Sequence, residues 1–99
     1  MFVLVVSFRA KKGKEKEIEH LFHEMTRKVC LNEKETLNYD LHRKVGDAAE
    51  FLLYERYTNR KALEVIHCSK PYFKELLEAM PNYVEGEIVK TEYELIEAK

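Results

Sequence analysis

Several residue types that mark common functional sites are scarce in this chain. It has three glycines, two prolines, two cysteines and no tryptophan. Three scattered glycines cannot form the glycine-rich loop that cradles a phosphate or a dinucleotide, so no nucleotide or flavin cofactor is expected. Cys30 and Cys68 show neither metal-ligand nor redox spacing. Two lone thiols in a chain without an export signal predict a reduced protein of the cytoplasm.

An excess of charge of one sign is also missing. Seventeen Lys and Arg residues face eighteen Asp and Glu residues, for a net charge of −1. Nucleic acids are bound by clustered, uncompensated basic residues, and the one dense basic stretch, 11–14, is followed at once by Glu15 and Glu17. We interpret that stretch as a solvated loop and expect no nucleic-acid partner. No run approaches the ~20 apolar residues of a membrane span, and the apolar run 2–6 is too short for a signal sequence.

A chain of 99 residues is expected to form a single domain over residues 1–99, and its apolar residues repeat with the periods of helices and strands. No repeat or linker interrupts the pattern. The expected elements are a strand over 2–9, a helix over 14–31, strands over 36–43 and 50–57, short helices over 60–67 and 70–80, and a strand over 87–96. This order predicts an α+β, ferredoxin-like split βαβ fold, in which helices cover one face of a four-stranded antiparallel sheet.

Polar residues mark the expected ends of the helices. Asn32 tolerates the left-handed conformation and is expected to end the first helix. Asn59 and Ser69 are expected to cap the two short helices, and Pro71 falls in the first turn of the second, where a missing N–H costs nothing. Residues 45–47 supply turn chemistry, so the two middle strands are expected to form a hairpin.

The first and third strands are apolar on both faces. In the first strand Val3 and Val5 point to one face while Leu4 and Val6 point to the other. Helices cover only one face of such a sheet, and a bare apolar face is an association site. The simplest cover is a second copy related by two-fold symmetry. We therefore expect a homodimer through the sheet face; the alternative is a central strand that is merely hydrophobic in a monomer.

Several segments share their order and spacing with one protein family. They are 8–15, 37–43, 51–57, 60–64, His67 and 69–73. Together they resemble the antibiotic biosynthesis monooxygenase family, also called quinol-monooxygenase-like proteins, over nearly the whole chain. The resemblance implies a dimeric α/β barrel and a cofactor-independent monooxygenase that oxidises a small aromatic or quinol-type substrate. A non-catalytic dimer that binds a small apolar ligand and an isomerase of a small oxygenated metabolite are the alternatives.

His67 and Tyr72 are the candidates for catalysis. His67 lies at the edge of the apolar face of its short helix, and an imidazole at the rim of a pocket can take a proton from a phenol or quinol. It resembles the family's histidine, six residues before Phe73, although this chain carries one extra residue between Ala62 and His67. Tyr72 is the tyrosine that could remove the proton instead. A capped, purely structural histidine is the alternative.

Other side chains are expected to line a substrate pocket. Glu55 shares a strand face with Leu53 and Tyr57, so its carboxylate must be paired, hydrogen-bonded or protonated. A structural ion pair is favoured over a catalytic base. Flat aromatic walls with a few hydroxyls suit a quinol-like ligand, and ordinary core is the alternative. The expected substrate-binding residues are Ser7, Tyr39, Tyr54, Glu55 and Phe73.

Neither a metal site nor haem chemistry is expected. His20 and His23 could share an ion, but the helical period places both away from the apolar stripe, which favours a solvated helix back. Haem-degrading relatives work with an asparagine, a tryptophan and a histidine. This chain has Ser7 and Leu77 at what resemble the first and last of these positions, and it has no tryptophan.

Overall fold

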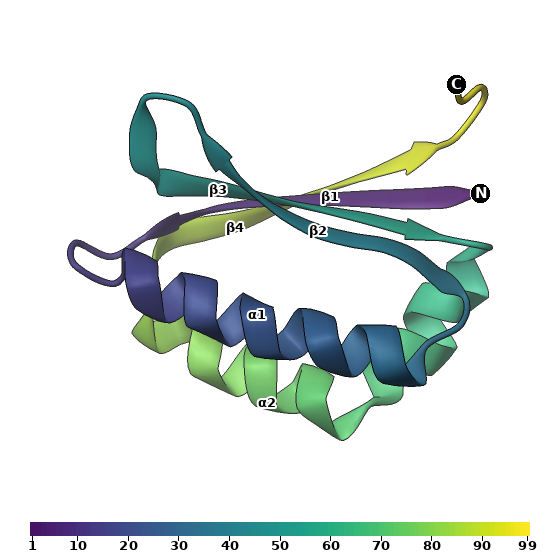
Figure 1. Ribbon diagram of the computed structural model, residues 1–99, viewed down its shortest axis with the longest axis horizontal. Helices are drawn as coiled ribbons and strands as arrows, with labels where there is room; N and C mark the ends of the chain where they lie inside the picture. Colours follow the sequence, from purple (N-terminus) through teal and green to yellow (C-terminus); the bar gives the residue numbers. More distant parts are fainter.

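The elements follow one another in the order that the apolar pattern predicts. In the computed structural model, which describes residues 1–99, they are β1 (Phe2–Ala10), α1 (Glu15–Asn32), β2 (Thr36–Lys44), β3 (Asp47–Tyr57), the π-helix η1 (Ala62–Ile66), the 3₁₀ turn η2 (His67–Ser69), α2 (Pro71–Ala79), the 3₁₀ turn η3 (Met80–Asn82) and β4 (Val84–Glu94). The strands form one antiparallel sheet in the order β2-β3-β1-β4 (Figure 1). The predicted α+β, ferredoxin-like fold is confirmed.

Strand β1 lies between β3 and β4, and its register decides which side chains share a row. On the face toward the helices, Leu4 lies between Glu55 of β3 and Glu92 of β4. In the next row Val6 lies beside Lys90. Three charged residues are thereby placed on the helix face of the sheet, among mostly apolar neighbours.

Both α-helices lie against this one face of the sheet (Figure 1). The inward stripe of α1 carries Ile18, Phe22, Met25 and Val29, none of them more than 3% exposed. Their spacing of three and four residues is that of one helix face. The Phe22 ring stacks on the ring of Phe8 in β1, with 5.5 Å between the centroids. Burial of each of these side chains contributes roughly 1.5–3 kcal/mol to the free energy of unfolding, so this stripe is a main source of the packing of α1 on the sheet.

Two of the predicted strands differ from the structure by more than one residue at an end. The third strand begins at Asp47, three residues earlier than expected, because Gly46 takes a positive φ of 86° and allows a tight hairpin turn. The last strand covers Val84–Glu94 and not 87–96, since pairing with β1 already starts where Val84 lies opposite Ala10. The expected hairpin of β2 and β3 is confirmed.

The asparagines act at helix ends in two different ways. Asn59 accepts a hydrogen bond at Oδ1 from the backbone N–H of Ala62, at 2.9 Å, and so caps the helical turn that begins at Arg60 and continues into η1, as predicted. Helix α1 ends at Asn32 as expected, but not through a left-handed residue, because no residue other than glycine has a positive φ. Instead the Asn32 amide donates to the carbonyl of Lys28 at 2.7 Å.

The prediction that Ser69 caps α2 is wrong. Its hydroxyl points backward and donates to the carbonyl of Ile66 at 2.9 Å. Lys70 precedes the helix without a side-chain bond, and Pro71 occupies the first turn. A proline at this position fits, because its missing N–H would have no helical partner.

The segment expected to be a regular helix over 60–67 is a π turn followed by a 3₁₀ turn. The backbone N–H of His67 donates to the carbonyls of Ala62 and Leu63. The bond to Ala62 spans five residues, as in a π-helix, which holds more residues per turn than an α-helix. After this turn the side chain of His67 is buried inside the protein, at 1% exposed.

No element covers the other face of the sheet, which we call the open face (Figure 1). It presents Leu52, Val89 and Tyr93, whose side chains are 38%, 53% and 54% exposed. Val5 and Tyr54 lie between them and are half-buried. The two-faced apolar pattern of β1 and β3 is therefore present in the structure. No helix of the chain combines the length and the apolar content needed to cross a membrane.

Candidate functional site

A cavity of about 410 Å³ opens between the helix face of the sheet and the segment from η1 to α2. We call it the central cavity. Thirteen of its sixteen lining residues are hydrophobic, and the exceptions are Glu55, Lys90 and Glu92. A few polar groups in an otherwise apolar cavity are typical of a site that binds an apolar molecule and orients it.

The floor of the central cavity is a row of four residues, one from each strand of the sheet. Tyr39 of β2, Glu55 of β3, Leu4 of β1 and Glu92 of β4 lie side by side across the sheet. The roof includes Phe73 from α2 and Cys68 from η2. The polar groups of the floor therefore come from the β2–β3 hairpin and from β4, which follows that hairpin only after η1, η2, α2 and η3.

Glu55 is the buried carboxyl group of the central cavity. It is only 4% exposed, and the hydroxyl of Tyr57 donates a hydrogen bond to its Oε1. Burial raises the pKa of the Glu55 carboxyl, and the bond from Tyr57 only partly offsets this. The sequence favoured an ion pair for Glu55, but its partner is a tyrosine hydroxyl. A carboxyl group with a raised pKa in an apolar site is suited to exchange a proton with a ligand.

His67 lies behind the wall of the central cavity and does not line it. It is 1% exposed, and Nδ1 lies 2.8 and 3.0 Å from the two carboxylate oxygens of Glu33. Its ring packs against the rings of Tyr39 and Phe73, with centroid distances of 5.4 and 5.0 Å. The expected position at the rim of a pocket is therefore not what the structure shows.

Glu33, the residue after α1, collects three hydrogen bonds. They come from Nδ1 of His67, from the hydroxyl of Tyr72, and from the hydroxyl of Thr36 at 2.7 Å. Burial by itself would raise the pKa of Glu33, but these three donors outweigh it and hold the pKa below its usual value. Since an ionised carboxylate only accepts, Nδ1 of His67 carries the proton that it shares with Glu33.

Glu33 was not singled out in the sequence. It belongs to a polar run, 32–35, which is typical of a solvated helix end. Its burial depends on contact with His67, 34 residues further along the chain. Only a search for a partner of His67 could have drawn attention to it, since a histidine is often oriented by a carboxylate.

The structure brings together some of the predicted site residues and separates the others. Tyr39, Glu55 and Phe73 line the central cavity. Tyr72 lies at the groove between α1 and α2, where it reaches Glu33. Ser7 and Tyr54 lie on the open face, because residues at odd positions of β1 and their partners in β3 point away from the helices. The pair His20 and His23 lies on the outer side of α1, away from the cavity.

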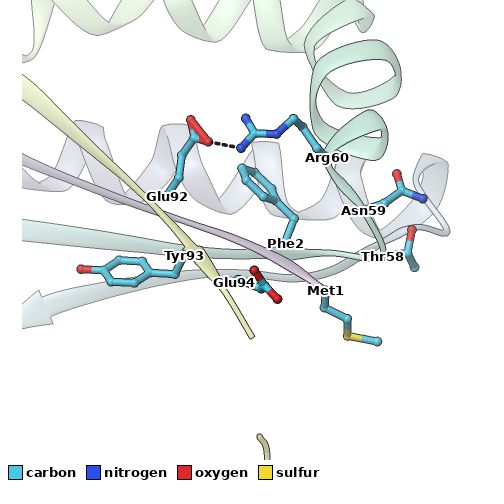
Figure 2. Close-up of a pocket in the computed structure, with 8 residues that line it drawn as sticks. All are labelled: Met1, Phe2, Thr58, Asn59, Arg60, Glu92, Tyr93 and Glu94. Carbon is cyan, nitrogen blue, oxygen red and sulfur yellow. Dashed lines mark ion pairs between the residues drawn. The ribbon is translucent and has the colours of Figure 1, made fainter. Parts of the chain in front are cut away.

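A second hollow, the edge hollow, lies where β1 and β4 meet the turn after β3 (Figure 2). The guanidinium of Arg60 stands over the ring of Phe2, 4.5 Å from its centroid. The same guanidinium pairs with Glu92 at 2.5 Å and with Glu64 at 3.3 Å. Glu92 lines both hollows, whereas Tyr93 points to the opposite side of β4. The edge hollow contains no buried titratable group and is a poor place for proton chemistry.

Comparison with known proteins adds a family and a fold. The model of the antibiotic biosynthesis monooxygenase family matches residues 1–79. A solved structure from Caulobacter crescentus CB15 that carries the same family name is 27% identical, with a TM-score of 0.90 over 97% of this chain and 90% of that one. One from Deinococcus radiodurans, also of that name, is 20% identical, with a TM-score of 0.87 over 100% and 96% of the two chains. None of the curated proteins matches this chain.

Proposed function

The chain belongs to the antibiotic biosynthesis monooxygenase family, and from this premise we propose that it oxidises a small aromatic or quinol-type substrate with molecular oxygen in the central cavity. The observation that carries the proposal is the buried Glu55 carboxyl in an otherwise apolar cavity of about 410 Å³. Apolar walls accept flat rings, and the carboxyl group supplies the proton acceptor that such a substrate requires.

In the proposed reaction, Glu55 accepts a proton from a phenolic or quinol substrate. The resulting anion transfers one electron to oxygen, and the substrate radical and superoxide then combine at a ring carbon. The resulting peroxide anion takes the proton back from Glu55 to give a hydroperoxide. Cleavage of its O–O bond and of the C–H bond at the same ring carbon releases water and leaves a carbonyl group on the ring. One oxygen atom enters the product and the other leaves as water. The apolar walls favour this sequence, because they keep water away from the anion and the radical.

We assign His67 and Tyr72 to positioning and not to proton transfer. His67 supports two walls of the cavity, Tyr39 and Phe73, from behind. The carboxylate of Glu33 in turn holds the ring of His67 by a hydrogen bond and accepts a second hydrogen bond from the hydroxyl of Tyr72. Replacing His67 by alanine is expected to lower the rate by disturbing the shape of the cavity, because a small displacement of a positioned substrate costs much of its reactivity.

Oxygen uptake tests the proposal. The protein is incubated with a panel of reduced quinols and dihydroxynaphthalenes, and oxygen consumption and products are followed. We expect at least one compound to consume one oxygen molecule per carbonyl group formed, at a lower rate with His67→Ala. No uptake with any compound would contradict the proposal. Tight binding without turnover would support a ligand-binding dimer instead, and conversion without oxygen uptake would support an isomerase.

A homodimer through the open face is part of the same proposal. The open face carries Val5, Leu52 and Val89 and has no cover within the chain. Introducing charges there with Leu52→Glu together with Val89→Glu is expected to yield monomers, because each new carboxylate would be buried or would face like charge across the two-fold axis. Leu31→Glu, at the 78% exposed end of α1, is the matched control and should leave the dimer intact.

Sedimentation and small-angle scattering measure the outcome. One chain has a mass of 11.8 kDa, and the wild-type protein should give about twice this mass. A wild-type protein that sediments as a monomer at tens of micromolar would remove the dimer from the proposal.

A further inference from the structure

Lys90 is the one charged group of the central cavity without a partner. It lies on the helix face of β4, beside Val6, and lines the cavity together with Glu55 and Glu92. Each of those two carboxylates has a partner, Tyr57 and Arg60 respectively. The ammonium group of Lys90 takes part in no ion pair and no side-chain hydrogen bond of the chain.

The carboxylate nearest to Lys90 along β4, that of Glu92, is already paired with another residue. Glu92 is two residues away on the same face of β4, where it could reach the ammonium group. Instead it pairs with Arg60 at 2.5 Å, toward the edge hollow (Figure 2). Arg60 is itself held by the ring of Phe2 and by Glu64. The Arg60–Glu92 pair therefore leaves a free positive charge at the β4 side of an apolar cavity.

The charge of Lys90 acts on the interior of the cavity. Burial raises the pKa of Glu55 and of Cys68, and in both cases the Lys90 ammonium acts in the opposite direction. No carboxylate oxygen of Glu55 lies within ion-pair distance of Lys90, so this influence operates through space. A group bound between the sheet and α2 would feel the same field.

We propose that the ligand of the central cavity carries an anionic group, a carboxylate or an acidic phenolate, which pairs with Lys90 while its apolar rings lie against the aromatic walls. This inference deepens the proposed function, on which it rests for the identity of the cavity as the substrate site. Lys90 is then a specificity residue. Arg60 acts through Glu92 as a positioning residue, since it prevents an internal carboxylate from occupying the place of the ligand's anion.

A matched pair of ligands tests the inference. The probes are 1-hydroxy-2-naphthoate and the corresponding carboxamide, which differ in charge but hardly in shape. Their dissociation constants are measured by calorimetry without oxygen. We expect the carboxylate to bind about tenfold more tightly than the amide, which corresponds to about 1.4 kcal/mol. The preference should decrease with added salt, because the ion pair is only partly shielded from solvent.

Variants separate the role of Lys90 from general charge effects. Lys90→Gln should abolish the preference for the carboxylate and leave the affinity for the amide unchanged, whereas Lys90→Arg should retain the preference. Arg60→Gln should reduce it with Lys90 intact, because Glu92 is then free to compete. Lys74→Gln, which removes an exposed charge of α2 outside the cavity, is the matched control. Circular dichroism checks that each variant is folded.

Three results would overturn the inference: equal affinities for the two ligands, an unchanged preference in Lys90→Gln, or no binding of the carboxylate at millimolar concentration. The measurement involves no turnover, so its failure is distinct from a failure of the oxygen-uptake experiment. A protein that oxidises neutral quinols but does not prefer the carboxylate would keep the proposed function and lose this inference.

Discussion

Replacing Glu33 by alanine is expected to lower the free energy of unfolding by about 3–5 kcal/mol. The substitution removes the common acceptor of three donors, on His67, Tyr72 and Thr36. A donor left without a partner costs roughly 1–3 kcal/mol, with the buried His67 at the upper end and the partly buried Tyr72 and Thr36 at the lower end of this range. The contacts tie the end of α1 to η2 and α2, so the loss affects the whole helix layer.

Urea unfolding at neutral pH measures this effect as a lower midpoint at an unchanged slope. Glu78→Ala is the control, because Glu78 is an exposed glutamate of α2 and its loss should stay within about 0.5 kcal/mol. Thr36→Val removes a single donor and should cost less than Glu33→Ala. A loss below about 1 kcal/mol for Glu33→Ala would show that the network contributes little to the fold.

The stabilisation by Glu33 should depend on pH in a defined direction. The pKa of Glu33 is lower in the folded protein than its ordinary value. Its contribution is therefore fully present above the unfolded pKa of about 4.3 and is lost as the pH falls through the lower, folded pKa. The difference in stability between the wild type and Glu33→Gln should shrink over that acidic range. A difference that stays constant down to about pH 2 would contradict the assigned charge of Glu33.

The second large effect is expected from Glu55→Gln, which should lower the turnover number about 10²–10⁴-fold. Glutamine keeps the shape and can still accept the hydroxyl of Tyr57, but it cannot take a proton. The dissociation constant of the substrate should change little. Oxygen uptake gives the rate and anaerobic titration gives the affinity. Glu87→Gln, an exposed glutamate of β4 outside the cavity, is the matched control.

The pH dependence provides a second readout for Glu55. Burial raises its pKa, so the rate should increase as the pH rises through that value, at a higher pH than for an ordinary glutamate. This rise should be absent in Glu55→Gln.

The pH dependence of stability that Glu55 causes runs in the opposite direction. The protonated form is favoured in the folded state, so its contribution to the free energy of unfolding is present below the unfolded pKa and is lost as the pH rises through the folded pKa. Glu55→Gln should therefore be at least as stable as the wild type above neutral pH. Full activity in this variant would remove Glu55 from the mechanism.

Local periodicity accounts for the parts of the molecule that could be predicted. The stripe of Ile18, Phe22, Met25 and Val29 defines a helix face from sequence spacing alone, and it is the face that is buried. The alternation in β1 likewise places Val5 and Val6 on opposite sides of the sheet. Such patterns depend on residues within one element, so they are visible without any knowledge of the neighbours.

The candidate site could be predicted only in part, for the same reason. Strand parity placed Tyr39 and Glu55 among the apolar residues of their strands, and both line the central cavity. His67 was expected at a rim, but a helical wheel cannot anticipate the π turn that rotates it toward Glu33. Nothing in the sequence marks Lys90 as a site residue, because an exposed lysine in a strand resembles any solvated residue. Its role becomes visible only when the neighbouring carboxylate, Glu92, is seen to be paired with Arg60.

The sequence by itself therefore determined the α+β class, the order of the elements and the two apolar faces of the sheet, because each of these follows from the period of side chains along a single element. Only the tertiary structure decided which polar groups meet. The contact of Glu33 with His67 and the free charge of Lys90 depend on distances between elements, and those distances are set by how the helices pack on the sheet.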